Sequence, residues 1–169
     1  MRQETLRLKS FSPEDTRAFG RMLGEALSGG EAILLEGPLG AGKTVLVQGI
    51  GLGIGYKGRV LSPSFVLERV HQGRLTLRHL DLYRLSGDEA MEAGLLEEPD
   101  SKTVVVVEWA QRAEGLLLWT IKISMELVPF SPEERRISIE ASNLKWGEKA
   151  KDVVSRFEER RARGAGPRN

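Results

Sequence analysis

The sequence contains no cysteine and few aromatic residues. None of its 169 residues is cysteine, and Phe, Trp and Tyr together make up 6%. The absence of cysteine excludes disulfide bonds, thiolate metal sites and cysteine nucleophiles, and it fits a reducing compartment. The chain also lacks the run of roughly 18 apolar residues that a membrane-spanning helix needs. Its first residues are polar and do not form the apolar core of a signal peptide. We therefore expect a cytoplasmic protein.

The chain also lacks an excess of charge of either sign. The chain has 25 basic and 24 acidic residues, a formal net charge of +1, so its overall field favours neither nucleic acid nor a membrane surface. Its length suits one α/β domain with a substantial core. We expect residues 1–157 to form that domain. Residues 158–169 are rich in Arg and Gly and have no apolar periodicity, which predicts a basic, disordered tail.

Two continuous apolar runs, Ala32–Leu35 and Thr103–Val107, have the pattern of strands buried on both faces of a sheet. Apolar residues at helical spacing alternate with them, and Ser12-Pro13 and Ser86 have the form of helix starts. The other expected elements are an edge strand at 5–9, a helix ending at 28–30, a helix at 44–54, a hairpin of 65–70 with 74–82, a short helix at 86–94, an antiparallel pair of 120–127 with 136–140, and a C-terminal helix from about 146.

The strongest motif is a glycine-rich loop, Gly37–Thr44, which fits G-x-x-x-x-G-K-[ST] at every fixed position. A predicted buried strand precedes it and a predicted helix follows it, which is the setting that a phosphate-binding loop requires. Such a loop wraps backbone N–H groups around a phosphate chain, and glycine permits the necessary conformations and the close approach. The motif predicts a nucleotide site made of Gly37, Leu39, Gly40, Ala41, Gly42, Lys43, Thr44 and Val45.

Within this loop, Lys43 is expected to bind the β- and γ-phosphates and the Thr44 hydroxyl to ligate Mg²⁺. A second glycine pattern, G-x-G-x-x-G at Gly53–Gly58, follows a helix and not a strand, so we interpret it as a helix-ending loop and not as a dinucleotide site. His71 and His79 have no thiol or carboxylate at ligand spacing, and no zinc site is predicted.

Two carboxylates are candidates for the metal and for catalysis. Glu108 ends the apolar run at 103–107, where a phosphate-loop site needs an acidic group; the alternative is a Glu emerging into solvent. Asp81 follows His79 and precedes Tyr83 on one face of a predicted strand, and that face could instead point to water.

Ser62 and Ser64 flank Pro63 between the loop unit and the predicted hairpin. Their hydroxyls could reach the metal or the γ-phosphate, as a switch segment does. A plain Ser-Pro turn is equally compatible with the composition.

These blocks together resemble the TsaE (YjeE) family of bacterial ATPases, which are required for threonylcarbamoyladenosine formation in tRNA. The matching stretches, in the family's order, are 37–44, 62–65, 79–85 and 108–109. The three stretches after the glycine-rich loop are more specific to the family than the loop itself, which very many proteins share. The departures are Pro38, where the family often has Asp, Ser64, where it usually has Thr, and the stretch 115–118, which replaces a more familiar Leu-Pro ending.

The resemblance implies a P-loop NTPase-like three-layer α/β sandwich with a mixed, mainly parallel central sheet. It implies ATP and Mg²⁺ as ligands, and partners of the TsaB and TsaD type. It further implies that Lys43 binds phosphate, that Thr44 and Glu108 hold Mg²⁺, and that Asp81 assists at the metal or at the attacking water. Trp109 would line the site or a partner surface, or else be a core aromatic.

Other function classes stay open at this point. A small-molecule kinase would share the loop, although no arginine-rich lid segment is evident, and a non-hydrolysing assembly protein would share the nucleotide site. A guanine-reading Asn/Thr-Lys-x-Asp segment is absent from the sequence. Arg84, Arg135 and Arg136 are candidates for an arginine finger or for ordinary surface charge. Contact with tRNA could involve Arg156, Arg160, Arg161, Arg163 and Arg168 of the C-terminal region.

Overall fold

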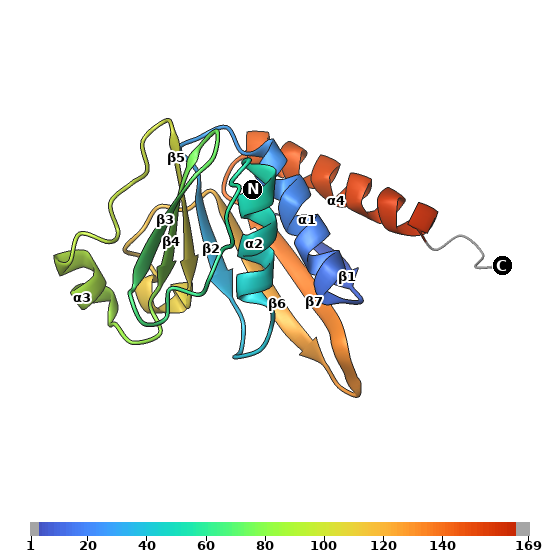
Figure 1. The fold of residues 1–169 in the computed structure, drawn as a ribbon, viewed down its shortest axis with the longest axis horizontal. Helices are drawn as coiled ribbons and strands as arrows, with labels where there is room; N and C mark the ends of the chain where they lie inside the picture. Colours follow the sequence, from blue (N-terminus) through green and yellow to red (C-terminus); the bar gives the residue numbers. More distant parts are fainter. Residues whose placement is uncertain (1–3, 165–169) are drawn as a thin grey trace.

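The structure is a computed structural model and describes residues 4–164. A seven-stranded sheet carries helices on both faces (Figure 1). In chain order the elements are β1 (Thr5–Ser10), α1 (Pro13–Ala26), β2 (Ala32–Glu36), α2 (Lys43–Gly53), β3 (Glu68–Gln72), β4 (Thr76–Asp81), α3 (Gly87–Glu92), β5 (Thr103–Glu108), the 3₁₀ helix η1 (Ala110–Ala113), β6 (Ile121–Val128), β7 (Ser131–Ala141) and α4 (Leu144–Gly164).

The strand order is β1-β7-β6-β2-β5-β4-β3. The middle strands β6, β2, β5 and β4 run parallel, whereas the pairs β1–β7, β6–β7 and β3–β4 at the two margins are antiparallel. The mixed sheet with a parallel centre confirms the predicted fold class. The apolar runs at 32–35 and 103–107 are the adjacent strands β2 and β5, which are covered on both faces.

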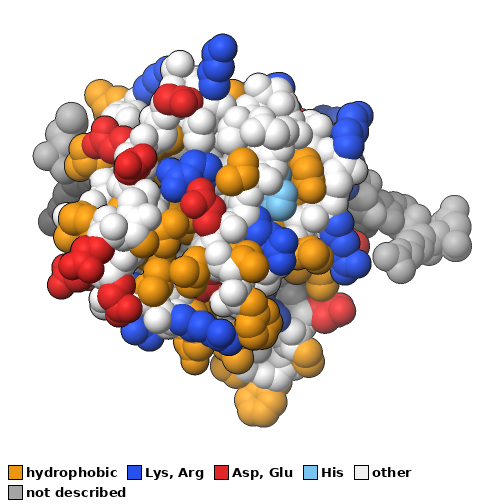
Figure 2. Space-filling view, turned by 60° about the vertical axis from the view of Figure 1, so that its left-hand side comes forward, with side chains coloured by type: hydrophobic (Ala, Val, Ile, Leu, Met, Phe, Trp, Pro, Cys, Tyr) orange, Lys and Arg blue, Asp and Glu red, His pale blue; other side chains and the backbone are white. Residues whose placement is uncertain are grey.

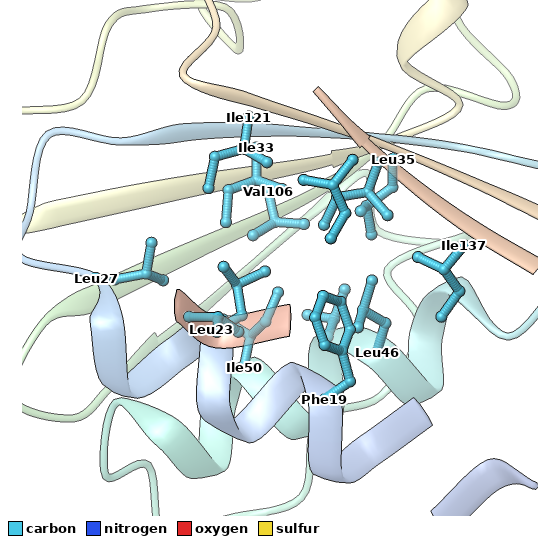
Figure 3. Close-up of a cluster of buried hydrophobic side chains, with 14 of the residues drawn as sticks. Phe19, Leu23, Leu27, Ile33, Leu35, Leu46, Ile50, Val106, Ile121 and Ile137 are labelled. Atoms are coloured by element: carbon cyan, nitrogen blue, oxygen red, sulfur yellow. The ribbon is translucent and has the colours of Figure 1, made fainter. Parts of the chain in front are cut away.

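The larger core lies between the sheet and the helices α1, α2 and α4. Figure 3 shows α1 and α2 side by side, with their apolar side chains pointing at the sheet. Because apolar residues recur at helical spacing on these helices, one stripe of each is buried. The labelled members of the cluster are Phe19, Leu23, Leu27, Ile33, Leu35, Leu46, Ile50, Val106, Ile121 and Ile137.

The opposite face of the sheet has a thinner cover. The short α3, η1 and the segments around them pack on Leu34, Leu80, Val105 and Val107, which form a second core cluster. The architecture therefore has three layers, as predicted, with the helical layers unequal in thickness. The predicted helix starts are also confirmed: the Ser12 side chain accepts from Asp15 N, and Ser86 with Glu89 forms a capping box.

Helices α1 and α2 touch through glycines. A Cβ atom added at Gly20 would lie 2.4 Å from the Leu46 carbonyl oxygen, and one added at Gly49 would lie 2.2 Å from the Arg17 carbonyl oxygen. Gly24 and Gly53 repeat the arrangement one turn further along. The two backbones therefore approach too closely for any side chain at these positions, which fixes α2, and the loop before it, against α1.

Sequence-based boundaries change at the C-terminal helix and in the first hairpin. Helix α4 continues to Gly164, so residues 158–164 are helical and not part of a disordered tail. Their Glu and Arg residues are good helix formers, and the guanidinium of Arg161 lies over the Phe11 and Phe157 rings. Residues 165–169, Arg168 among them, lie outside the described part of the chain. The hairpin strand expected from residue 65 begins at Glu68, because Leu67 has a positive φ of 68°. In the segment Gly53–Gly58, α2 ends at Gly53 and turn and loop follow, as predicted.

Candidate functional site

The predicted site residues meet at one edge of the sheet. Strands β2, β5 and β4 are parallel neighbours, so their carboxyl ends lie together. The glycine-rich loop follows β2, Glu108 ends β5 and Asp81 ends β4, and Glu108 is in register with both Leu35 and Asp81. Ligand sites in open α/β sheets lie at this edge.

The glycine-rich loop has the backbone that its sequence predicts. Gly40 and Gly42 adopt φ values of 79° and 96°, which other residues rarely adopt. A Cβ atom at Gly37 would lie 2.7 Å from the Met125 carbonyl oxygen. Gly42 is the N-cap of α2 and offers no side-chain hydrogen bond, so the first N–H groups of that helix have no side-chain cap. A helix start of this kind, next to a glycine loop, suits an anion.

The Lys43 side chain folds back over this loop. Its Nζ donates to the carbonyl oxygens of Gly37 at 2.6 Å and Pro38 at 3.1 Å, and it lies 4.1 Å from the centroid of the Trp109 ring. Burial lowers the pKa of Lys43 below its ordinary value, and the neighbouring carboxylates of Glu108 and Asp81 oppose that shift. The ammonium is thus placed where an incoming anion would meet it.

Glu108 is buried and has two partners. Its Oε1 accepts from the Thr44 hydroxyl at 3.4 Å, and its Oε2 lies 2.8 Å from Nε2 of His79. His79 Nδ1 has no partner among the described residues, so a ring that carries its proton on Nε2 and donates to Glu108 accounts for the contact. The alternative of a glutamate emerging into solvent is therefore wrong.

Asp81 is also buried, which excludes the water-facing alternative. Its Oδ2 accepts from the Ser64 hydroxyl at 2.9 Å and its Oδ1 from the Tyr83 N–H at 2.9 Å. The Ser62 and Ser64 hydroxyls lie 2.6 Å apart. The segment at 62–64 is thus tied to the end of β4 through Ser64.

The other predicted positions lie around this centre. Leu39 is 85% exposed at the tip of the loop, whereas Ala41 is buried and Val45 half-buried. Trp109 has a left-handed backbone, packs partly on the second core and lies 4.9 Å, centroid to centroid, from the Tyr83 ring. Trp109 therefore meets two of the expectations at once: it packs against the core and it lines the site.

The three candidate arginines lie in different surroundings. The Arg84 guanidinium covers the Phe65 ring, and that of Arg135 binds the backbone of the glycine-rich loop. Arg136 lines a groove with Lys9 and Arg161. On the side of the molecule that Figure 2 brings forward, apolar side chains are interspersed with charged ones.

The sequence did not predict the contacts that the structure gives to His79 and Arg135, although Arg135 was a candidate arginine finger or surface charge. The signal for His79 was its spacing of two from Asp81, which puts both on one strand face. No local signal marks Arg135, whose partners lie 94 and 95 residues away. Within residues 4–164 no group of three or more His, Asp or Glu side chains is arranged to hold a metal by itself, and no helix there is long and apolar enough to cross a bilayer.

The fold is that of an α/β protein with a mixed, centrally parallel sheet and a glycine-rich loop between β2 and α2. The family model described as "Threonylcarbamoyl adenosine biosynthesis protein TsaE" matches residues 10–137. The chain belongs to the TsaE family.

Individual relatives and a solved structure agree with this family assignment. The chain is 38% identical over 125 residues to the tRNA threonylcarbamoyladenosine biosynthesis protein TsaE of Treponema pallidum (strain Nichols), a match covering 73% of this chain and 93% of the relative. It is 43% identical over 131 residues to the protein of that name from Mycobacterium leprae (strain TN), covering 70% and 80%. The crystal structure described as Bacillus subtilus YdiB superposes with a TM-score of 0.75 at 26% identity, covering 94% of this chain and 99% of the other.

Proposed function

We propose that this protein binds ATP with Mg²⁺ at the glycine-rich loop and hydrolyses it as an accessory to threonylcarbamoyladenosine modification of tRNA in the cytoplasm. The observation that carries the proposal is the meeting of Lys43, Thr44 and Glu108 where β2 and β5 end. The names of the relatives supply the tRNA modification. Proteins of the TsaB and TsaD type are the proposed partners.

The residues present fit a magnesium ion. Mg²⁺ prefers oxygen ligands and usually takes one or two from the protein and the rest from phosphate and water. The Thr44 hydroxyl and the Glu108 carboxylate are 3.4 Å apart, and Asp81 is next to Glu108 in the sheet register. Thr44 and Glu108 would hold the ion, with Asp81 beside it. When bound, Mg²⁺ supplies positive charge against the phosphate oxygens.

The protein's own groups then account for the remaining steps. The backbone N–H groups of the loop and of the start of α2 bind the phosphate chain. Lys43 exchanges its two carbonyl partners, those of Gly37 and Pro38, for phosphate oxygens and neutralises charge that develops in the transition state. Asp81 orients the attacking water, and Ser64 holds that carboxylate in place.

Arg84 and Arg135 are not placed as free fingers, and Arg136 lines a groove with Lys9 and Arg161. The guanidinium groups of Arg84 and Arg135 are both engaged, by an aromatic ring and by backbone carbonyls respectively. A phosphate-loop site without a finger hydrolyses slowly by itself. We therefore expect a low basal rate that changes when the partner proteins and tRNA are added.

The test is phosphate release from ATP and from GTP, with and without partner proteins of the TsaB and TsaD type. Glu108→Gln and Asp81→Asn are expected to lower turnover by at least about tenfold while ATP binding persists for Asp81→Asn. Binding without turnover under every condition would favour the non-hydrolysing assembly protein. Phosphate transfer to a small acceptor would favour the kinase. Equal rates of hydrolysis with and without the partner proteins would contradict the expectation that the partners change the rate.

A further inference from the structure

The guanidinium of Arg135 joins the β6–β7 hairpin to the glycine-rich loop. Its Nε donates to the Ala41 carbonyl oxygen at 3.0 Å, and its Nη2 donates to that of Gly40 at 3.0 Å. Its Nη1 donates to the carbonyl oxygens of Pro132 and Glu134, both at 2.8 Å. In Figure 1 the loop between β2 and α2 and the hairpin lie at the same end of the molecule. One planar fork thus binds two carbonyls of each segment.

These contacts set the direction of two peptide units. The carbonyl and the N–H of one trans peptide point in opposite directions. The carbonyl oxygens of Gly40 and Ala41 face Arg135, so the N–H groups of Ala41 and Gly42 face away from the hairpin. The Ala41 N–H donates to Pro38 within the loop. Glycine at positions 40 and 42 leaves these peptide planes otherwise free to rotate, and two anchored carbonyls oppose that rotation.

The backbone of Arg135 lies between two neighbouring strands. The backbone of Arg135 is paired with Ser10 of β1 on one side and with Leu127 of β6 on the other. A side chain that leaves a doubly paired strand can position its partners more accurately than one on a loop. Among residues 4–164, no carboxylate lies within ion-pair distance of this guanidinium. Its positive charge therefore adds to that of Lys43 at the loop.

We propose that Arg135 is a positioning residue that holds the glycine-rich loop in its phosphate-binding conformation. The inference rests on the proposed nucleotide site and goes beyond it, because it assigns to Arg135 a role exerted through the loop backbone and not through contact with the reacting phosphate. Loss of the fork lets the peptides at 40–42 rotate, so every ligand that engages the loop binds more weakly, whether or not it carries a base.

The experiment compares ATP with inorganic tripolyphosphate, a probe that has no base or ribose, by titration calorimetry in the presence of Mg²⁺. Arg135→Gln removes the charge and the fork, and it is expected to weaken both ligands by the same factor, on the order of tenfold. Arg135→Lys keeps the charge without the fork, and its affinity for both ligands is expected to lie between those of the wild type and Arg135→Gln. The matched control is Arg7→Gln on the neighbouring strand β1, an exposed arginine with the same change of charge, which should bind both ligands as the wild type does.

The melting temperature of the ligand-free proteins separates positioning from a general structural role. Arg135→Gln should melt within a few degrees of the Arg7→Gln control while binding more weakly. Wild-type affinity in Arg135→Gln would overturn the inference, as would a loss confined to ATP, which would place the arginine on the base or ribose. A wild-type protein that binds neither ligand would instead overturn the proposed nucleotide site, and the inference with it.

Discussion

Nε2 of His79 lies 2.8 Å from Oε2 of Glu108, and both side chains are buried. The contact crosses from β4 to β5, two parallel strands, and the other oxygen of the same carboxylate faces Thr44. Because Glu108 carries the proposed metal-binding role, His79 fixes the orientation of that carboxylate. Histidine and glutamate therefore form one structural unit behind the site.

The first prediction concerns the stability of this pair. His79→Leu and Glu108→Leu each leave a buried polar partner unsatisfied and should each lower the free energy of unfolding by about 2–4 kcal/mol. The double variant should be destabilised by about 1–3 kcal/mol less than the sum. Denaturant unfolding of the four proteins measures this coupling. His71→Leu combined with Glu108→Leu is the control cycle, and strictly additive effects in the His79 cycle would contradict the assignment.

The second prediction concerns pH. Burial first, and then the neighbouring His79 and Arg69, lower the pKa of His71 below its ordinary value of 6.5. Below about pH 6.5 the unfolded chain therefore takes up a proton at His71 that the folded protein does not. The free energy of unfolding should fall as the pH drops from 7.5 to 5.5, by up to about 1.4 kcal/mol per pH unit for this one group.

His71→Gln should remove this part of the pH dependence. The comparison is the difference in unfolding free energy between pH 7.5 and pH 5.5, measured for both proteins in the same buffers. A variant whose stability falls with acid as steeply as that of the wild type would show that His71 binds protons equally in both states.

The third prediction concerns the glycine contact between α1 and α2. Gly49→Ala places a Cβ 2.2 Å from the Arg17 carbonyl oxygen, so the two helices must separate. We expect a loss of about 1–3 kcal/mol, as in an overpacked core. Gly147→Ala in α4 meets nothing within 4 Å and should instead stabilise the protein by about 0.5–1 kcal/mol. Thermal unfolding measures both, and equal melting temperatures for the two variants would contradict the close packing.

The fourth prediction separates the roles of Ser62 and Ser64. Ser64 donates to Asp81, whereas Ser62 is exposed and contacts Ser64. If Asp81 orients the attacking water, Ser64→Ala should lower the turnover of ATP by about fivefold to tenfold, with little change in affinity. Ser62→Ala should have a smaller effect, and Ser64→Thr, which retains a hydroxyl, should remain active. A loss of the same size in Ser62→Ala would contradict the role given to Ser64.

The parts of this account that the sequence predicted are those with a local signal. Continuous apolar runs identified β2 and β5, and the glycine-rich loop between a strand and a helix identified one edge of the sheet. Glu108 could be placed at that edge because it ends an apolar run, whereas Asp81 was predicted only to lie on one face of a strand, whose end it proves to be.

The parts that were missed depend on pairing between distant segments. The contact of His79 with Glu108 needs the register of β4 on β5, and that of Arg135 with the loop needs the β6–β7 hairpin to fold beside it. The end of α4 was missed for another reason: apolar spacing stops at Phe157, but helix propensity and the stacking of Arg161 carry the helix further.

The most direct test of the central claim is calorimetric titration of ATP with Mg²⁺ into the wild type and Lys43→Ala. Lys149→Ala is the matched control, because its Nζ also donates to a backbone carbonyl and lies over a tryptophan ring, but in α4. We predict binding by the wild type and by Lys149→Ala, and a loss of at least about tenfold in affinity for Lys43→Ala, since in the proposed site the Lys43 ammonium faces the phosphates and that of Lys149 does not. Wild-type affinity in Lys43→Ala, or no binding heat in the wild type, would contradict the account.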